Sequence, residues 1–241
     1  MKKTFFFVMI LFFVIGINAQ TYKASLTFYS SNIMGDLTSS DLTNPDAVYI
    51  QYGIGAGLEF MTYEALDGHL GIGGRFNYVE YEKDADAYND ALKFRLGIKD
   101  GNYDTRKAYF HIESNFQAGI SYLLAVSENV EVEPYVFLGF NVFTTPLESV
   151  IFYKDGITYN YRKNVNVYWG FSYAPGARVQ WRTHERFGMN FFVEYHGVTH
   201  GSDTETTVTT TYNSFVKTSR ERDYDYGAIN VGVGVTYTFG D

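Results

Sequence analysis

The sequence predicts a membrane-spanning β-barrel of eight antiparallel strands. Three observations lead to this fold class: long segments of strict alternation, a bulky apolar face on each segment, and connections that alternate between long and short. Alternation with a period of two indicates a strand whose two faces meet different surroundings. A tilted transmembrane strand needs about 9–11 residues, whereas strands of soluble proteins average about 5–6.

The clearest alternation runs without a break over residues 164–182. Its apolar face holds the large side chains and includes Trp169 and Trp181, while the opposite face is small or polar and includes Arg178. A soluble barrel keeps its bulky apolar side chains inside. The inverted arrangement is typical of a barrel with lipid outside and a narrow polar lumen.

Eight segments repeat this pattern of large apolar residues alternating with small or polar ones. The expected strands cover residues 21–31, 48–62, 69–81, 109–124, 130–143, 164–182, 189–200 and 226–239. Each of them is close to the length that crosses a bilayer.

The connections between these strands fall into two classes. The short ones centre on residues 66–68, 127–129 and 184–188, and the long ones cover residues 32–47, 82–107, 144–163 and 201–225. Strict alternation of short and long connections is typical of bacterial outer-membrane barrels, which have short periplasmic turns and longer extracellular loops. Both ends of the barrel domain are then expected on the periplasmic side.

Two of the long connections have strand character of their own. Residues 149–161 alternate around Asp155-Gly156 and predict a hairpin, and residues 204–218 are rich in threonine, which favours strands. We expect both to prolong the barrel strands above the membrane and to offer an edge for pairing with another chain. The segment 82–104 is rich in Asp and Tyr and is expected to be a solvated loop; weak cation binding is the alternative.

The first nineteen residues predict a secretory signal peptide. Lys2 and Lys3 precede an apolar run over residues 4–17, and Asn18-Ala19 offers a small-residue cleavage site. A transmembrane anchor is the alternative, but the run is shorter than the ~20 residues that a spanning helix needs. The predicted organisation is therefore a leader over residues 1–19 and a barrel domain over residues 20–241.

Composition excludes several functional classes. The chain has no cysteine, which removes disulfides, thiol nucleophiles and cysteine metal sites. Its net charge of −8 argues against nucleic acid as a partner. We expect no cofactor and no bound metal.

The whole barrel domain resembles the small eight-stranded outer-membrane barrels of the outer-membrane protein A/X and opacity type. The resemblance rests on the leader, the strand rhythm, the loop alternation and the terminal Tyr237-Thr238-Phe239. It implies a cell-surface location, contact with outer-membrane lipid and lipopolysaccharide, and recognition by the barrel-assembly machinery. It also implies interaction of the loops with an extracellular protein or surface ligand. Function is left open, because one scaffold carries unlike functions.

The inward positions predict a lumen filled with polar side chains. Counting from the short turns sets Glu59 opposite Arg75, Arg178 opposite Glu194, and Gly119 opposite Phe137. Buried charges must be paired, so we expect ion pairs that plug the lumen. Other polar side chains share this inward parity, namely His111, Glu113, Asn115, Gln117 and His196.

We therefore expect a non-enzymatic protein with a structural or surface-interaction role. One alternative is a narrow channel for small hydrophobic solutes. The other is a lipid-A-modifying hydrolase with His200 as base, Ser202 as nucleophile and Glu205 or Glu221 as the acid, since such a set activates a serine for acyl transfer.

Overall fold

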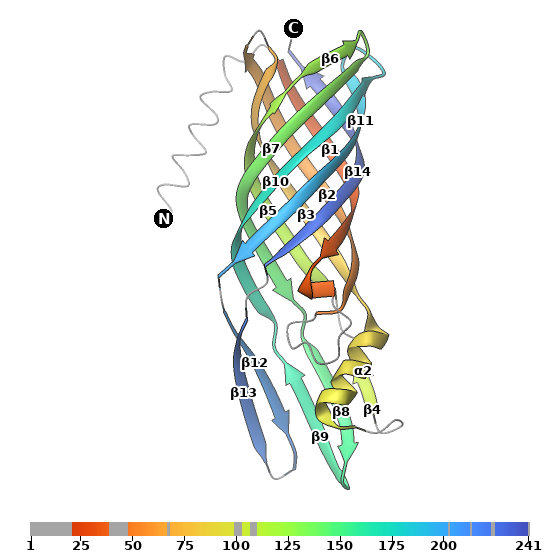
Figure 1. The fold of residues 1–241 in the computed structure, drawn as a ribbon, viewed down its shortest axis with the longest axis vertical. Helices are drawn as coiled ribbons and strands as arrows, with labels where there is room; N and C mark the ends of the chain where they lie inside the picture. The colour runs from red at the N-terminus through yellow and green to blue at the C-terminus, as the bar shows by residue number, and fades with distance from the viewer. Residues whose placement is uncertain are drawn as a thin grey trace.

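The structure is a closed antiparallel β-barrel that continues at one end into a second, smaller sheet (Figure 1). This computed structural model describes residues 21–38, 48–66, 68–98, 103–106, 110–201, 203–212, 214–222 and 225–240. The predicted leader lies outside the described residues. The barrel strands are β1 (Thr21–Met34), β2 (Ile50–Ala65), β3 (Leu70–Lys83), β5 (His111–Tyr122), β7 (Val130–Thr145), β10 (Asn166–Arg182), β11 (Phe187–His200) and β14 (Tyr226–Phe239).

Each barrel strand pairs with the next barrel strand in the chain, including β7 with β10, and one further pairing closes the ring. In that pairing β1 lies antiparallel to β14, from Tyr22 opposite Phe239 onward. The short β6 (Leu124–Ser127) pairs with β7 beside the turn at that end. All eight predicted strands are confirmed. The sheet closes on itself because a closed ring satisfies every backbone donor and acceptor of its strands in a bilayer.

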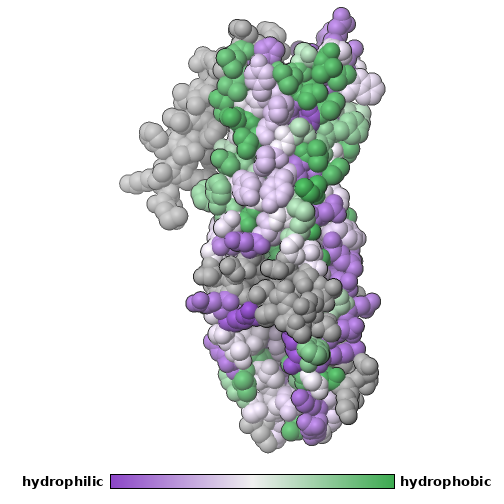
Figure 2. Space-filling view, in the orientation of Figure 1, coloured by the Kyte–Doolittle hydropathy of each residue, from purple (hydrophilic) through white to green (hydrophobic). Residues whose placement is uncertain are grey.

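The barrel carries its large apolar side chains on the outside. Phe28, Leu58, Phe140 and Trp169 point outward and are 55 %, 60 %, 69 % and 68 % exposed. Figure 2 shows apolar residues gathered over the barrel half and polar residues over the opposite half. On β3 the outward side chains change from apolar to acidic after Tyr78, at Glu80 and Glu82. We place the extracellular boundary of the lipid-facing belt there.

Inward aromatic rings pack onto glycines of neighbouring strands. A Cβ atom added at Gly55 would lie 2.4 Å from the Tyr29 ring. Gly119 faces Phe137 in the same way, and their predicted register is confirmed. Since eight strands enclose little space, a large ring fits where its neighbour has no side chain.

Beyond the belt, five strands form a second sheet, which we call the extracellular sheet after the orientation that the loop lengths predict. In spatial order they are β13 (Phe215–Arg222), β12 (Asp203–Thr210), β9 (Ile157–Lys163), β8 (Glu148–Lys154) and β4 (Tyr103–Arg106). The predicted hairpin around residues 155–156 is confirmed, and so is the predicted strand character of residues 204–218, which lie in the β12–β13 hairpin. The two hairpins stand beside each other because β12 also pairs with β9.

The expectation of a solvated loop over residues 82–104 is wrong. This segment contains helix α2 (Ala85–Leu96), capped by Asp84, whose side chain accepts a hydrogen bond from the Ala87 amide at 2.9 Å. The helix ends at Gly97 in the left-handed conformation. Leu92 packs with Val150 and Phe152 of the extracellular sheet. This tertiary contact stabilises the helix, whose sequence has only a weak amphipathic pattern.

A second helical segment, the 3-10 turn η1 (Asp36–Thr38), follows β1. Among the described residues, no helix is long and apolar enough to span a membrane.

Two glycine-to-alanine variants test the packing inside the barrel. Gly55→Ala is expected to lower the free energy of unfolding by about 1–3 kcal/mol, since the added methyl overlaps the Tyr29 ring. Gly74→Ala is the matched control on the lipid side, where the added Cβ would meet only the Gln117 carbonyl oxygen at 3.4 Å. Urea unfolding in liposomes, followed by heat-modifiable gel mobility, measures both. Equal stability of the two variants would contradict the packing argument.

Candidate functional site

The lumen holds a continuous column of buried polar side chains. They come from the inward positions of all eight barrel strands, as the period of two requires. The column consists of four levels of mutually bonded groups within the barrel, and a fifth level lies at the extracellular mouth.

The level nearest the periplasmic end is organised by Glu131. Its two carboxylate oxygens bind Lys23 at 2.9 Å and Arg182 at 2.7 Å. The Lys23 ammonium also donates to the Gln180 side chain at 3.1 Å. Both Glu131 and Lys23 are buried, so the charges compensate each other away from water.

The second level is centred on Arg178. Its guanidinium binds Glu59 at 2.6 Å and Glu133 at 3.0 Å. The Tyr63 hydroxyl donates to Glu133 at 2.6 Å. This one cation on β10 therefore binds a carboxylate of the neighbouring strand β7 and a carboxylate of β2, across the lumen.

The third level joins Arg75 to Glu194. Arg75 binds Glu194 at 2.7 Å and also donates to Gln117 at 2.7 Å. Glu194 accepts further bonds from Tyr135 at 3.1 Å and Asn230 at 2.9 Å. Five strands are cross-linked at this level.

These ion pairs differ from the predicted ones. Glu59 does lie opposite Arg75 in the register of β2 and β3, but each side chain binds a partner across the lumen instead. The predicted position of Arg178 opposite Glu194 is wrong: Arg178 lies opposite Phe192, and Glu194 lies opposite Gly176. The β10–β11 turn is centred one residue earlier than expected, which shifts the register by two and leaves the inward parity intact.

The fourth level is centred on Glu113. One of its oxygens accepts from Asn115 and Asn141 and lies 2.6 Å from the His196 ring, and the other accepts from Tyr81 at 2.5 Å. The Asn141 oxygen in turn lies 2.6 Å from the His200 ring. The predicted polar residues Glu113, Asn115 and His196 are thus brought together, and Gln117 joins the third level.

His111 is a separate case. Its ring stacks on Phe143 with centroids 5.7 Å apart, and it is fully buried. Neither ring nitrogen has a hydrogen-bond partner in the part of the chain that the structure describes. It lies between the Glu113 level and the mouth and contributes packing rather than charge pairing.

Little space remains between these side chains. A cavity of about 10 Å³ is enclosed by residues of the second and third levels, including Arg75, Arg178, Glu59 and Glu194. That volume holds about one water molecule.

At the extracellular mouth, four buried charges alternate in sign. Lys83 binds Glu148 at 2.5 Å, and Lys163 binds Glu205 at 2.7 Å. Glu148 and Lys163 are register partners on β8 and β9, and Glu148 also accepts from Tyr88 of α2. Sequence reasoning missed this group, because Glu148 and Glu205 belong to segments expected outside the barrel.

Burial and charge shift the pKa values of this mouth cluster. Burial lowers the pKa of Lys83 to about 8, although Glu148 acts in the opposite direction. Burial alone would raise the pKa of Glu148, but Lys83 and Lys163 outweigh it and hold that pKa below its usual range. Lys83 and Glu148 are therefore both predominantly charged at neutral pH.

Two residues of the alternative catalytic set, His200 and Glu205, bind different partners. Ser202 lies outside the described residues. His200 is buried in the lumen and its backbone amide donates to Asp225 at 2.8 Å, while Glu205 binds Lys163 in the mouth cluster. Within the described residues, no group of three or more His, Asp or Glu side chains is arranged to hold a metal ion.

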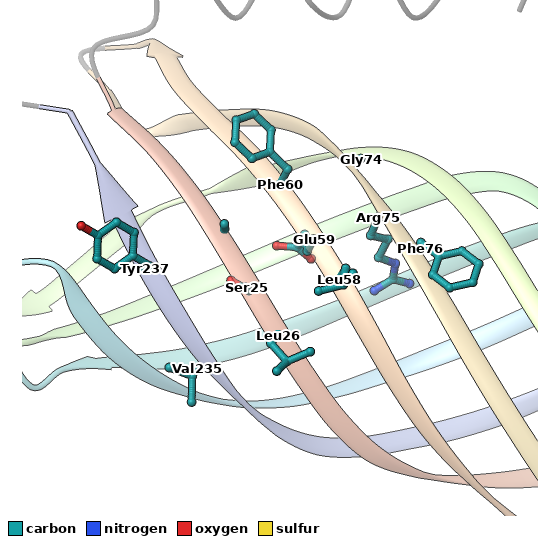
Figure 3. A pocket seen from close by; sticks show the side chains of 11 residues that line it. Ser25, Leu26, Leu58, Glu59, Phe60, Gly74, Arg75, Phe76, Val235 and Tyr237 are labelled. Carbon is teal, nitrogen blue, oxygen red and sulfur yellow. The ribbon is translucent and has the colours of Figure 1, made fainter.

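The outer wall carries an open groove of about 560 Å³ across β14, β1, β2 and β3 (Figure 3). Leu26, Leu58, Phe60 and Phe76 line it, and it exists because Gly74 has no side chain at an outward position. The groove lies within the lipid-facing belt.

Comparison with solved structures identifies the architecture. A major outer membrane protein of Thermus thermophilus superposes with a TM-score of 0.50 at 11% identity, over 90% of this chain and 99% of that chain. The chain has the fold of an outer-membrane β-barrel. Together with the lipid-facing belt, this fold places the protein in the outer membrane.

Two other barrels are also similar to this chain. The attachment invasion locus protein Ail of Yersinia pestis matches at 14% identity and a TM-score of 0.46, over 92% of this chain and 99% of that chain. Neisserial surface protein A matches at 10% identity and a TM-score of 0.42, over 92% and 98%. No family model matches the sequence, and no curated protein matches it.

Removing single carboxylates tests the column. Glu194→Gln is expected to cost about 3–5 kcal/mol of unfolding free energy, because it leaves the buried Arg75 without a carboxylate. Glu59→Gln is expected to cost less, since Arg178 keeps Glu133. The urea midpoints of the two variants in liposomes measure both losses of stability. The double variant Arg75→Met/Glu194→Leu removes the buried charge as well as its partner, so it should recover most of the stability lost in Glu194→Gln. A larger loss in Glu59→Gln than in Glu194→Gln would refute the pairing.

The mouth cluster predicts an unusual lysine titration. In protein carrying ¹³C-dimethylated lysines, the Lys83 resonance should titrate at about pH 8, and Glu148→Gln should lower that midpoint further by removing the carboxylate that raises it. Between about pH 8 and 10.5 the unfolded chain holds more protons at this site, so the contribution of Lys83 to stability rises with pH. Asp90→Asn, near Lys93 on α2, is the control and should leave Lys83 unchanged. A midpoint near 10.5 in the unaltered protein would exclude the buried state.

Proposed function

We propose that the protein is a non-enzymatic outer-membrane barrel with a closed lumen, which uses its extracellular sheet to bind other molecules at the cell surface. The observation that carries this proposal is the contrast between the two ends of the column. Below the mouth, charges and amides bind each other, and the cavity between the second and third levels has space for about one water. Beyond the mouth, an ordered sheet projects away from the membrane.

The lumen supports a structural role better than a transport role. Hydrophobic solutes would have to pass the Glu131, Arg178, Arg75 and Glu113 levels, each of which is charged and bonded across the lumen. Opening such a path would leave buried charges without partners, which costs several kcal/mol for each ion.

The extracellular sheet has the features of an interaction surface. Tyr212, Phe215 and Val216, at the end of the β12–β13 hairpin, are 100 %, 65 % and 57 % exposed. Exposed apolar side chains grouped on a projecting element indicate a contact site. Both hairpins are held rigidly on the barrel, because β12 pairs with β9 and the mouth cluster joins β3, β8, β9 and β12.

Conductance and surface binding test the two halves of this proposal separately. In planar bilayers the purified protein should show no steady conductance, and a large conductance that Glu59→Ala and Arg75→Ala leave unchanged would exclude the closed lumen. For surface binding, residues 206–219 are replaced by Asn-Gly, which keeps Glu205, the partner of Lys163, opposite Arg220. Cells that display this variant should lose retention on arrays of extracellular proteins. A variant with the same replacement of residues 155–156 is the control, and equal retention of all three proteins would contradict the proposal.

A further inference from the structure

The extracellular sheet ends in one long unpaired edge. Among the described residues, β13 pairs only with β12, whereas the other edge strand, β4, has four residues. The β12–β13 register runs from Asp203 opposite Arg222 to Thr210 opposite Phe215 without a bulge. The edge contains no proline. Eight residues of regular strand therefore present backbone donors and acceptors for pairing.

The side chains along this edge differ in chemistry from one end to the other. The distal end carries Phe215 and Val216, on opposite faces of the strand, and Lys217 follows. All three side chains are exposed. An added strand would place one residue beside each of them, and cross-strand neighbours interact most strongly when apolar residues meet apolar ones and opposite charges meet.

The charge of Lys217 is not neutralised by its own sheet. Its register partner on β12 is Val208, and Val208 lies opposite Arg162 of β9, which lies opposite Ser149 of β8. Arg106 of β4 lies opposite Ser149 and completes this row of register partners, which contains three cations and no carboxylate, in a chain whose net charge is −8. The row favours a partner that brings a negative charge to the edge.

A second copy of this chain fits the edge poorly. If two β13 strands paired antiparallel over their full length, Lys217 of one copy would lie opposite Arg220 of the other. Like charges directly opposite each other are destabilising. A lysine on an edge strand is a known protection against self-association. Here Lys217 also favours a partner protein whose added strand carries a negative charge.

We propose that β13 accepts an extended acidic peptide segment of another protein as an added antiparallel strand. The peptide places an acidic residue opposite Lys217 and apolar residues opposite Val216 and Phe215. This inference rests on the proposed surface-binding function and specifies its partner. The backbone edge supplies affinity, and Lys217 and the two apolar side chains supply register and selectivity.

The test uses the full barrel in lipid nanodiscs and two labelled eight-residue peptides. Both carry valine opposite Phe215 and Val216 and threonine elsewhere; one has glutamate opposite Lys217 and the other has lysine. By fluorescence anisotropy, the glutamate peptide should bind about tenfold more tightly than the lysine peptide. In Lys217→Glu the preference should reverse, whereas Lys93→Glu on α2, which makes the same charge change elsewhere on the extracellular part, should keep it.

Backbone methylation identifies strand pairing as such. In an added strand, alternate amides of the peptide face β13 and the others face away. N-methylation of one alternate set should abolish binding, and methylation of the other set should leave it unchanged. Equal effects of the two sets, or no reversal in Lys217→Glu, would overturn the proposal.

Other occupants give different results, each of which also overturns it. If dextran sulfate binds in a Lys217-dependent manner while neither peptide does, the edge is a polyanion patch. If sedimentation shows a dimer that Phe215→Ser abolishes, a second copy covers the edge. Loss of cell retention on replacement of residues 206–219, together with no peptide binding, would refute the acidic strand and leave the proposed surface function standing.

Discussion

The structure depends on one constraint: in a bilayer, every backbone donor and acceptor must be satisfied within the protein. A closed ring of eight strands meets this requirement. It also fixes a lumen so narrow that side chains fill it. The polar residues on the inner face of each strand therefore have little water to bind, and most of them bind each other. The glycines beneath Tyr29 and Phe137 follow from the same lack of space.

The column that results is a network rather than a set of separate pairs. Arg178 holds two carboxylates, Glu194 accepts from three side chains, and Glu113 is bonded by groups from β3, β5, β7 and β11. Each level connects strands that are not neighbours in the sheet. Such cross-links oppose flattening of the barrel, and they make the lumen a structural element that holds the wall in one shape.

The extracellular part extends this arrangement beyond the membrane. The mouth cluster Lys83, Glu148, Lys163 and Glu205 continues the polar column into the second sheet. Helix α2 covers one face of that sheet through Leu92 and Tyr88. The hairpins are thus held at defined positions, and the β13 edge is presented by a rigid support.

The alternation of side chains along the sequence determined the strands, their lipid-facing and lumen-facing sides, and the inward set that includes Glu59, Arg75, Arg178 and Glu194. The alternation determines these features because, in a strand, the parity of a residue alone decides which face its side chain lies on, whatever the neighbouring strands are. Only the tertiary structure decided which inward charges bind. Partners across the lumen depend on barrel closure, on the position of each turn and on side-chain length, and a one-residue difference in the β10–β11 turn was enough to move Arg178 away from Glu194. Helix α2 and the mouth cluster likewise depend on contacts between segments that are distant in the chain, such as Leu92 with Phe152 and Lys83 with Glu148. A local sequence pattern does not predict such contacts.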